Sequence, residues 1–155
     1  MDLAKNLKIE SVCRLQLPPP VMLTPQSTVR QAVALMQEHR IGCMVVCQNG
    51  KLVGVFTERD LLKRVVGPGK PLSLTLQECM TPQPVTVQAR EPIGAAMRRM
   101  HEGGYRHLPV VDENGQPVGV VSVKRIVRYL VEHFPETVYN QPPDPGVVQK
   151  DRDGA

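Results

Sequence analysis

The sequence predicts an α/β (α+β) fold in which two tandem β-α-β-β-α units pack sheet to sheet with pseudo-two-fold symmetry. Three observations predict it: an internal repeat, apolar residues at the helical period, and a hairpin turn in each copy. Residues 49–57 (NGKLVGVFT) match residues 114–122 (NGQPVGVVS) at an offset of 65, whereas upstream matches fall at an offset of 64. We expect the one-residue slip to lie in the loop around 103–104, because loops tolerate insertions.

Both copies contain the same succession of elements. The first helix begins with a capping box, since Thr28 is followed three residues later by Gln31. Its apolar residues recur at i, i+3, i+4 and i+7, and Pro92 suits the first turn of the matching helix. Residues 48–50 (QNG) and 113–115 (ENG) are typical of tight hairpin turns. The expected elements are an extended piece (21–23), a helix (28–39), two strands (43–47 and 52–56) and a second helix (58–66), and in the second unit 85–87, 92–102, 108–111, 118–121 and 123–133.

These elements divide the chain into domains. One unit of about 55–60 residues buries too little surface to be secure alone, so two copies gain by sharing a core. We expect residues 67–71 (GPGKP) to join the units, and the end of the chain, rich in Pro, Gly and Asp, to be disordered. The sequence leaves open whether 6–17 adds a helix or a strand. The predicted domains are an N-terminal extension (1–10), a first unit (11–70), a second unit (71–134) and a disordered tail (135–155).

Composition argues against several classes of protein. The 155 residues contain no apolar run near the roughly 18 residues of a membrane helix, and the first residues lack the layout of a signal peptide. We therefore expect a cytoplasmic protein with no membrane contact. The four cysteines form no C-x-x-C pair and the four histidines show no metal-ligand spacing. We predict no metal, no catalytic residue, no catalytic cofactor and no enzymatic activity.

Charge gives only a weak preference for anionic partners. The net charge is +4, and residues 135–155 hold two basic and four acidic residues, which leaves +6 on the rest of the chain. The three tyrosines and two phenylalanines, with no tryptophan, disfavour stacking of single-stranded nucleic acid. Nucleic-acid binding is therefore the third of three functional hypotheses.

Two longer motifs complete the pattern. Residues 54–60 read GVFTERD at the end of a predicted strand, and residues 105–112 read YRHLPVVD around another. Together with the repeat, they make residues 11–134 resemble a pair of CBS (cystathionine-β-synthase) domains, also called a Bateman module, as a stand-alone protein. The resemblance implies adenosine-containing ligands such as AMP, ADP, ATP or S-adenosylmethionine in clefts between the units, and disc-shaped homodimers.

The first motif has a chemistry that follows from its residues. A strand ends at Phe56 and a helix begins near Thr57, where free N–H groups attract anions. The Thr57 hydroxyl can bond a phosphate or ribose oxygen, and Asp60, one turn farther on, can accept bonds from both ribose hydroxyls. The alternative is that Thr57 and Asp60 only cap the helix, with no ligand. The two roles are compatible.

The resemblance extends this motif to a first ligand site. In family terms, adenine contacts come from residues 22–24 and 41–44, and phosphates meet basic residues of the opposite unit, where Arg106 and His107 stand. The simpler alternatives are core packing for Cys43 and Met44, and a solvated loop for Arg106 and His107. The implied residues are Leu23, Thr24, Ile41, Gly42, Cys43, Met44, Val55, Thr57, Arg59, Asp60, Arg106 and His107.

The second copy departs from this pattern. Residues 119–125 (GVVSVKR) keep a hydroxyl at Ser122, but Arg125 replaces the ribose carboxylate and cannot accept hydrogen bonds. Cations in the first turn of a helix are unfavourable, so Lys124 and Arg125 indicate a nearby anion unless solvent simply screens them. We predict one adenosine site for each pair, at Asp60, and a second site that is empty, anion-filled or non-standard. Its residues are Thr86, Val87, Arg106, His107, Leu108, Pro109, Val120, Ser122, Lys124, Arg125 and Arg40.

The leading functional hypothesis is a regulatory module that senses an adenosine-containing ligand and signals to an unknown partner protein by conformational change. Ligand would stabilise the form that binds it, and would shift the conformation only through its different affinities for the two forms. The second hypothesis is a homodimeric adapter whose ligand sites have decayed, which the altered second motif supports. Weak binding of nucleic acid is the third.

Overall fold

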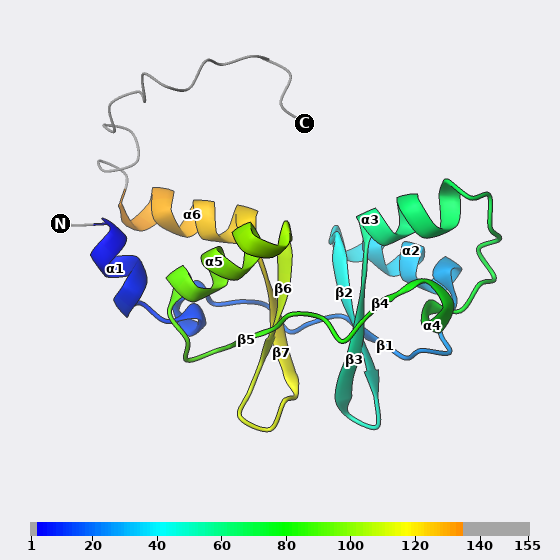
Figure 1. Cartoon of the computed structure of the whole chain (residues 1–155), viewed down its shortest axis with the longest axis horizontal. Coiled ribbons are helices and arrows are strands. Elements are labelled where there is room, and N and C mark those ends of the chain that lie inside the picture. The colour runs from blue at the N-terminus through cyan, green and yellow to red at the C-terminus, as the bar shows by residue number, and fades with distance from the viewer. Residues whose placement is uncertain (1–2, 135–155) are drawn as a thin grey trace, which may run out of the picture.

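The computed structural model of the chain describes residues 3–134, so the predicted tail (135–155) lies outside the described residues. Two sheets face each other at the centre of the molecule, and helices cover their outer sides (Figure 1). This architecture confirms the predicted fold class. The strands are β1 (Met22–Leu23), β2 (Cys43–Gln48), β3 (Lys51–Thr57), β4 (Thr81–Pro82), β5 (Val87–Gln88), β6 (His107–Val111) and β7 (Pro117–Ser122).

The first sheet has the order β1-β2-β3-β4 and the second has the order β5-β6-β7. In each sheet the first strand runs parallel to the second, and the remaining neighbours are antiparallel. The helices are α1 (Leu3–Ile9), a 3-10 helix (Val12–Leu15), α2 (Val29–His39), α3 (Glu58–Asp60), a π-helix (Leu61–Val66), α4 (Leu76–Cys79), α5 (Ile93–Gly103) and α6 (Val123–His133).

The predicted helices are present, with one difference in kind. The capping box of α2 forms as expected: the Gln31 N–H donates to Thr28 Oγ1 (3.2 Å) and the Thr28 N–H donates to Gln31 Oε1 (2.9 Å). The helix expected over 58–66 is instead the short α3 continued by the π-helix, whose last turn donates the Gly67 N–H to the Leu62 carbonyl (2.8 Å). Helix α4 and strand β4 were not predicted.

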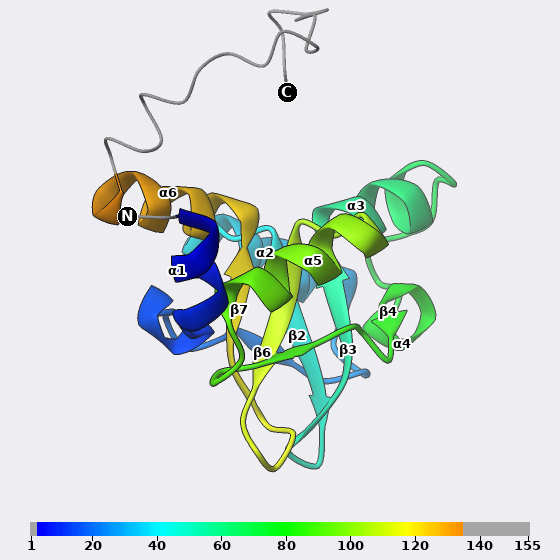
Figure 2. The ribbon, with the colours of Figure 1, turned by 60° about the vertical axis from the view of Figure 1, so that its left-hand side comes forward.

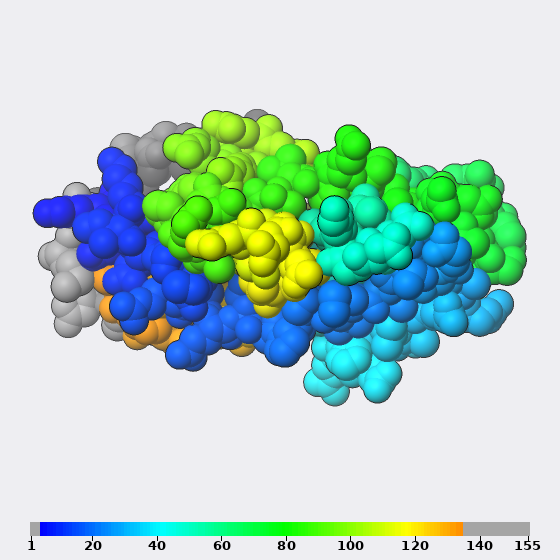
Figure 3. All heavy atoms as spheres, turned by 90° about the horizontal axis from the view of Figure 1, so that it is seen from below, coloured from blue at the N-terminus to red at the C-terminus, as the bar shows by residue number. Residues whose placement is uncertain are grey.

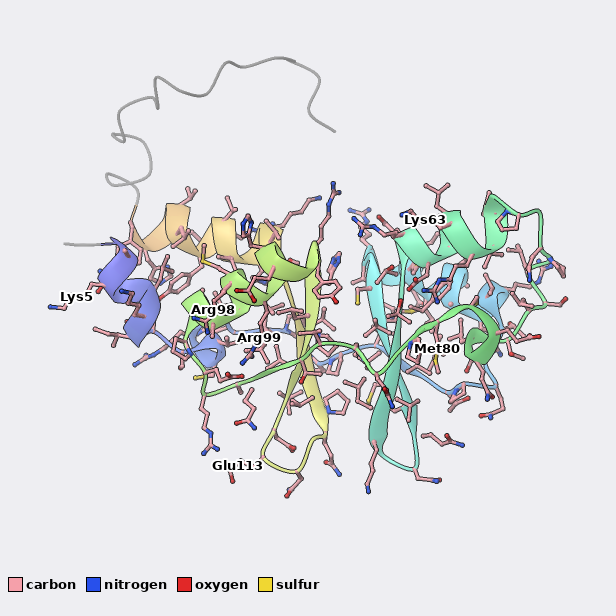
Figure 4. The ribbon with its side chains drawn as sticks, viewed as in Figure 1. Lys5, Lys63, Met80, Arg98, Arg99 and Glu113 are labelled. Atoms are coloured by element: carbon pink, nitrogen blue, oxygen red, sulfur yellow. The ribbon has the colours of Figure 1, made fainter. Side chains whose placement is uncertain are left out.

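The one-residue difference between the copies lies in the hairpins, so its predicted place around 103–104 is wrong. Strand β2 returns into β3 through the two-residue turn Asn49-Gly50, whose φ angles of 52° and 76° fit a primed turn. Strand β6 returns into β7 through three residues, 113–115, closed by Gly115 at φ 77°. Glu113 marks this longer turn in Figure 4, and Figure 3 shows the two hairpin tips, yellow and teal, side by side.

Two chain segments cross between the units. The 3-10 helix places Val12 and Leu15 in the core of the second unit, whereas Leu76 and Cys79 of α4 belong to the core of the first. Helix α1 packs on α5, and a side chain at Gly94 would meet the Leu7 carbonyl oxygen at 3.2 Å. Figures 1 and 2 show the blue segment leaving α5 and α6 for β1 and the green segment crossing the other way.

The segment at the start of each predicted unit (11–70 and 71–134) therefore packs in the core of the other unit. Residues 12–17 pack with the second unit, and residues 72–80 pack with the first. Hydrophobic periodicity cannot reveal this exchange, because it shows that a residue is buried but not in which of the two cores it is buried.

The sheets meet through a third, smaller apolar cluster. Cys43, Val45 and Val55 of the first sheet are buried together, with Val120 of β7 packed against them. Apolar contact between the sheets gives each unit the partner that its small size requires. The ends of these strands, next to the helices, form the floor of the site described below.

Candidate functional site

A cleft of about 1120 Å³ opens between the two units on the side of α2 and α6. Its walls come from the proline-rich segment before β1, the second half of α2, the start of β2, α3, and the first turns of α6. Its lining consists of Pro18, Pro19, Pro20, Val21, Val33, Met36, Gln37, Arg40, Ile41, Gly42, Cys43, Glu58, Leu61, Arg106, His107, Val120, Ser122, Val123, Lys124, Arg125 and Arg128.

The repeat places equivalent backbone on both sides of this cleft. In the first unit the Glu58 N–H donates to the Gly42 carbonyl (3.1 Å), which ties the start of α3 to the start of β2. In the second unit the Val123 N–H donates to the Arg106 carbonyl in the same way (3.0 Å). Each helix therefore begins beside the first residue of a neighbouring strand, and side chains from both of these junctions reach one space.

The lining of the cleft is strongly cationic. Arg40 ends α2, Arg106 precedes β6, and Lys124, Arg125 and Arg128 lie on α6, whereas Glu58 is the sole carboxylate in the lining. Within residues 3–134 none of these five cations forms an ion pair. Cations that converge without carboxylate partners favour an anionic ligand.

The same cleft is also lined by apolar side chains. Val33, Met36, Ile41 and Leu61 line it, and Cys43 contributes a side chain that is only 5% exposed. Burial raises the pKa of the Cys43 thiol to about 12, with a further contribution from the charge of Asp60, so the thiol stays neutral. A flat apolar group such as a base can pack against these side chains.

His107 lies in the cationic part of the cleft and is half-buried. Burial lowers the pKa of His107; Arg106 and Lys124 lower it further, whereas Glu58 raises it. The imidazole is therefore neutral at neutral pH. An anion placed next to it would favour the protonated form.

Ser122 caps α6. Its Oγ accepts the Arg125 N–H (3.1 Å). The first-turn side chains Lys124 and Arg125 then stand at the positive end of the helix dipole, where cations are unfavourable.

Asp60 does not line this cleft. Its side chain is buried, with the residue 5% exposed, and Oδ2 accepts hydrogen bonds from the Thr57 N–H and hydroxyl (both 3.1 Å). Oδ1 accepts the Thr81 hydroxyl from β4 (2.9 Å), and Arg64 Nε lies 3.7 Å from it. The carboxylate thus caps α3 and binds the crossing segment. This geometry agrees with the capping alternative and disagrees with a free acceptor for a ribose diol facing a cleft.

The structure divides the expected first site. Ile41, Gly42, Cys43, Arg106 and His107 line the cleft, so five of its residues come together there. Arg59 instead reaches the Gly104 carbonyl of the other unit (3.4 Å). The remaining residues outside the lining are Leu23, Thr24, Met44, Val55, Thr57 and Asp60.

The expected second site is better assembled. Seven of its residues line the cleft: Arg40, Arg106, His107, Val120, Ser122, Lys124 and Arg125. Thr86, Val87, Leu108 and Pro109 do not. Leu108 is instead buried in the core of the second unit, as is Val87.

Sequence reasoning missed several residues of the lining. Arg128 could have been found, because it follows Lys124 by one helical turn and therefore shares its face. Val33 and Met36 belong to the apolar stripe of α2, which sequence alone assigns to the core. Residues 18–20 give no local signal, because their position depends on the crossing of the chain between the units.

Two further searches concern only the described part of the chain. No group of three or more His, Cys, Asp and Glu residues is placed there to hold a metal ion. No helix there is long and apolar enough to span a bilayer.

The family model described as the CBS domain matches residues 12–67 and 76–132. The chain therefore belongs to the CBS-domain family and contains two CBS domains, as the motifs indicated. It is 40% identical over 110 residues to the CBS domain-containing protein CBSCBSPB1 of Arabidopsis thaliana. This match covers 70% of this chain and 20% of that protein. It is 33% identical over 118 residues to the uncharacterized protein MK0525 of Methanopyrus kandleri. This match covers 73% of this chain and 60% of that protein.

Solved CBS-domain structures share the fold. The CBS domain protein PAE2072 from Pyrobaculum aerophilum, complexed with AMP, has a TM-score of 0.71 and 28% identity, covering 79% of this chain and 99% of that one. The CBS domain pair of MJ0100, in complex with 5′-methylthioadenosine and S-adenosyl-L-methionine, has a TM-score of 0.72 and 26% identity, covering 80% and 98%. Those two proteins therefore bind adenosine derivatives on the same fold.

Proposed function

We propose that the chain is a regulatory module that binds an adenosine-containing ligand in the cleft between its two CBS units. The observation that carries the proposal is the cleft itself, which is lined by both apolar and cationic side chains and draws on both units. A base and a phosphate-bearing sugar need those two environments. The ligands of PAE2072 and MJ0100 support the same class of ligand, AMP or S-adenosylmethionine. The role is one of binding rather than catalysis.

Signalling would follow from the position of the cleft. A ligand that contacts Gly42 and Glu58 on one side and His107 and Lys124 on the other changes the free energy of holding the units together. A partner protein, or a second copy of the chain in the homodimer that the family implies, would respond to that change. The identity of the partner and the cytoplasmic location stay predictions.

A structural adapter is the second candidate. The observation in its favour is that Asp60 is fully engaged by Thr57 and Thr81, while Arg125 stands at the equivalent position of the second motif. Neither motif then offers a free carboxylate to a ribose. On this reading the pair of units would only hold other proteins together.

A thermal-shift panel separates the candidates. AMP, ATP, S-adenosylmethionine and a short oligonucleotide are added to the wild type, Asp60→Ala, Arg106→Ala and the control Arg98→Ala, whose exposed side chain lies on α5 outside the cleft (Figure 4). We expect a nucleotide to raise the Tm of the wild type, Asp60→Ala and Arg98→Ala, and to raise that of Arg106→Ala less.

Each other outcome opposes the proposal. If no adenosine compound shifts the Tm of any variant, the adapter is favoured. If only the oligonucleotide acts, and its effect fades with salt, the weaker nucleic-acid hypothesis is favoured.

A further inference from the structure

We propose that the cleft selects its ligand by charge, taking adenosine di- or triphosphate with the phosphates on α6 and discriminating against S-adenosylmethionine. This inference rests on the proposed function and narrows it to one class of ligand. It follows from the number, origin and lack of partners of the cations in the cleft.

The cations come from separate elements and converge on one space. Arg40 approaches from the end of α2, Arg106 from the position just before β6, and three more from α6. Side chains that come from such different places meet only because the fold brings them together. Since Glu58 is the sole carboxylate in the lining, the excess of positive charge is large for a space of this size.

Helix α6 also carries positive charge at an unfavourable position. Its eleven residues begin with Val123, so Lys124 and Arg125 occupy the first turn, where the helix dipole repels cations. Arg128 extends the cationic face by one more turn. An anion bound across these three side chains removes the repulsion among them and is favoured by the positive end of the helix dipole.

Few carboxylates are free to accept hydrogen bonds from the ribose hydroxyls, so the affinity depends mainly on the phosphates. Arg125 can only donate, and Asp60 already accepts three hydrogen bonds within the protein. Glu58 is the one carboxylate in the lining, and its Cδ lies 3.1 Å from the place that a Cβ on Gly42 would occupy. The diol therefore finds few free acceptors, and each additional phosphate finds further cationic donors.

S-adenosylmethionine presents the wrong charge to the cations of the cleft. Its methionine portion carries a sulfonium and an ammonium group against one carboxylate, so it is a net cation. Placed among Arg106, Lys124 and Arg125, it would be repelled where a triphosphate is attracted. AMP, with a single phosphate, should fall between the two.

The test is a series of calorimetric titrations at one fixed, low ionic strength with ATP, ADP, AMP, S-adenosylmethionine and inorganic tripolyphosphate. We expect ADP and ATP to bind at least about tenfold more tightly than AMP, since a charge-assisted hydrogen bond is worth about 1.5–3 kcal/mol. We expect S-adenosylmethionine to bind most weakly of the nucleosides. Tripolyphosphate alone should bind more weakly than ATP, because it makes no contact with the apolar side chains of the cleft.

Two variants make the comparison specific. Arg128→Ala should weaken ATP by about five- to tenfold and AMP much less. Lys63→Ala is the matched control: Lys63 stands 65 residues before Arg128, at the equivalent position on the π-helix, and lies outside the cleft (Figure 4). Its removal should leave all affinities unchanged.

The outcomes separate this inference from the proposed function. If S-adenosylmethionine binds as tightly as ATP, or if AMP equals ATP, charge selection is overturned while an adenosine site stands. If Arg128→Ala and Lys63→Ala behave alike, the phosphates do not lie on α6 and the inference fails. If tripolyphosphate binds and no adenosine compound does, the proposed function itself fails.

Discussion

Asp60 is the residue whose environment differs most from expectation. One carboxylate accepts the N–H and hydroxyl of Thr57 and the hydroxyl of Thr81, which lies on a different crossing of the chain. It thereby fixes the start of α3 to β4. A buried carboxylate with three donors contributes to folding through those bonds, whether or not a ligand ever reaches it.

We predict that Asp60→Asn lowers the free energy of unfolding by about 1–3 kcal/mol, because the amide offers one acceptor oxygen and leaves a buried donor unpaired. Urea denaturation measures the change. Thr81→Val removes only the bond to Oδ1 and should cost less, about 1 kcal/mol. Equal stability of Asp60→Asn and the wild type would show that the carboxylate does not hold this junction.

His107 supplies a pH dependence at the same scale. Burial lowers its pKa in the empty protein, with Arg106 and Lys124 acting in the same direction and Glu58 against them. Because a bound anion favours the protonated ring, we predict that affinity for ATP increases as the pH falls from about 7.5 to about 6. The measurement is calorimetric titration across that range.

The control for this prediction is His107→Gln, which keeps a polar side chain but cannot titrate. Phosphate groups also gain protons in this range, which acts in the opposite direction and is common to both proteins. The difference between wild type and variant therefore isolates the ring. Parallel pH profiles would contradict a role for His107 at the ligand.

Single residues also show what sequence reasoning can and cannot supply. The sequence correctly indicated a helix start beside Ser122 with cations in its first turn, because helix boundaries and charge are local properties. It could not show that Asp60 is satisfied from within, since Thr81 lies 21 residues away and reaches it only through the crossing of β4.

At the scale of elements, α5 is tied to the strand before it by an ion pair. Arg99 donates from Nη2 to Glu91 Oε1 (2.6 Å) and from Nη1 to Oε2 (2.7 Å), and the Gln88 N–H also donates to Oε2 (2.7 Å). The same guanidinium bonds the Thr86 carbonyl (3.2 Å). Figure 4 shows Arg99 pointing from α5 toward that strand. The bidentate geometry fixes the helix on the sheet.

We predict an acid-sensitive stability from this pair. The hydrogen bonds from Arg99 hold the pKa of Glu91 down to about 2, well below its ordinary value of 4.5. A lowered pKa in the folded state stabilises the protein above about pH 4.5 and loses that contribution as the pH falls toward 2. The contribution is at most about 3 kcal/mol.

Chemical denaturation between neutral pH and about pH 2.5 measures this contribution. Glu91→Gln should be less stable than the wild type at neutral pH and should show a smaller loss on acidification. The two proteins should converge in acid. A constant difference at every pH would mean that the charge of Glu91 does not contribute.

Elements with local signals were predictable, and those set by distant contacts were not. Capping, periodicity and Asn-Gly turns located α2, α5, α6 and the hairpins to within a residue or two. The π-helix has no such signal: Arg64 on it donates to the Met80 carbonyl (2.6 Å) on the crossing segment, so its packing depends on a remote part of the chain. Helix α4 has four residues, too few for a period.

At the scale of the whole molecule, the two crossings make each unit depend on the other. The core of the second unit contains Leu15, from the start of the first unit, and the core of the first contains Leu76, from the start of the second. Unfolding either unit therefore withdraws part of the core of the other. The duplication yields one cooperative structure rather than two independent domains.

We predict a single unfolding transition, with calorimetric and van't Hoff enthalpies that agree. Leu15→Ala should lower the stability by about 2–5 kcal/mol and shift this one transition without splitting it. Differential scanning calorimetry measures both. Two resolved transitions, or a variant that destabilises only one of them, would contradict the coupling of the units.

The whole molecule also explains why the cleft suits a sensor. Its walls belong to both units, so a ligand there acts on the same arrangement that the crossings hold. The free energy available is set by ligand concentration and affinity, about 2.7 kcal/mol at one hundred times the Kd. That is comparable to the contributions of Leu15 or Asp60.

The most direct test is a crystal structure of the chain grown with ATP. The proposed function and the charge inference together predict density for the nucleotide in the cleft, with the base near Ile41 and the phosphates against Lys124, Arg125 and Arg128, while Asp60 keeps its bonds to Thr57 and Thr81. Nucleotide bound at Asp60 in place of Thr81, with the cleft empty, would contradict the account.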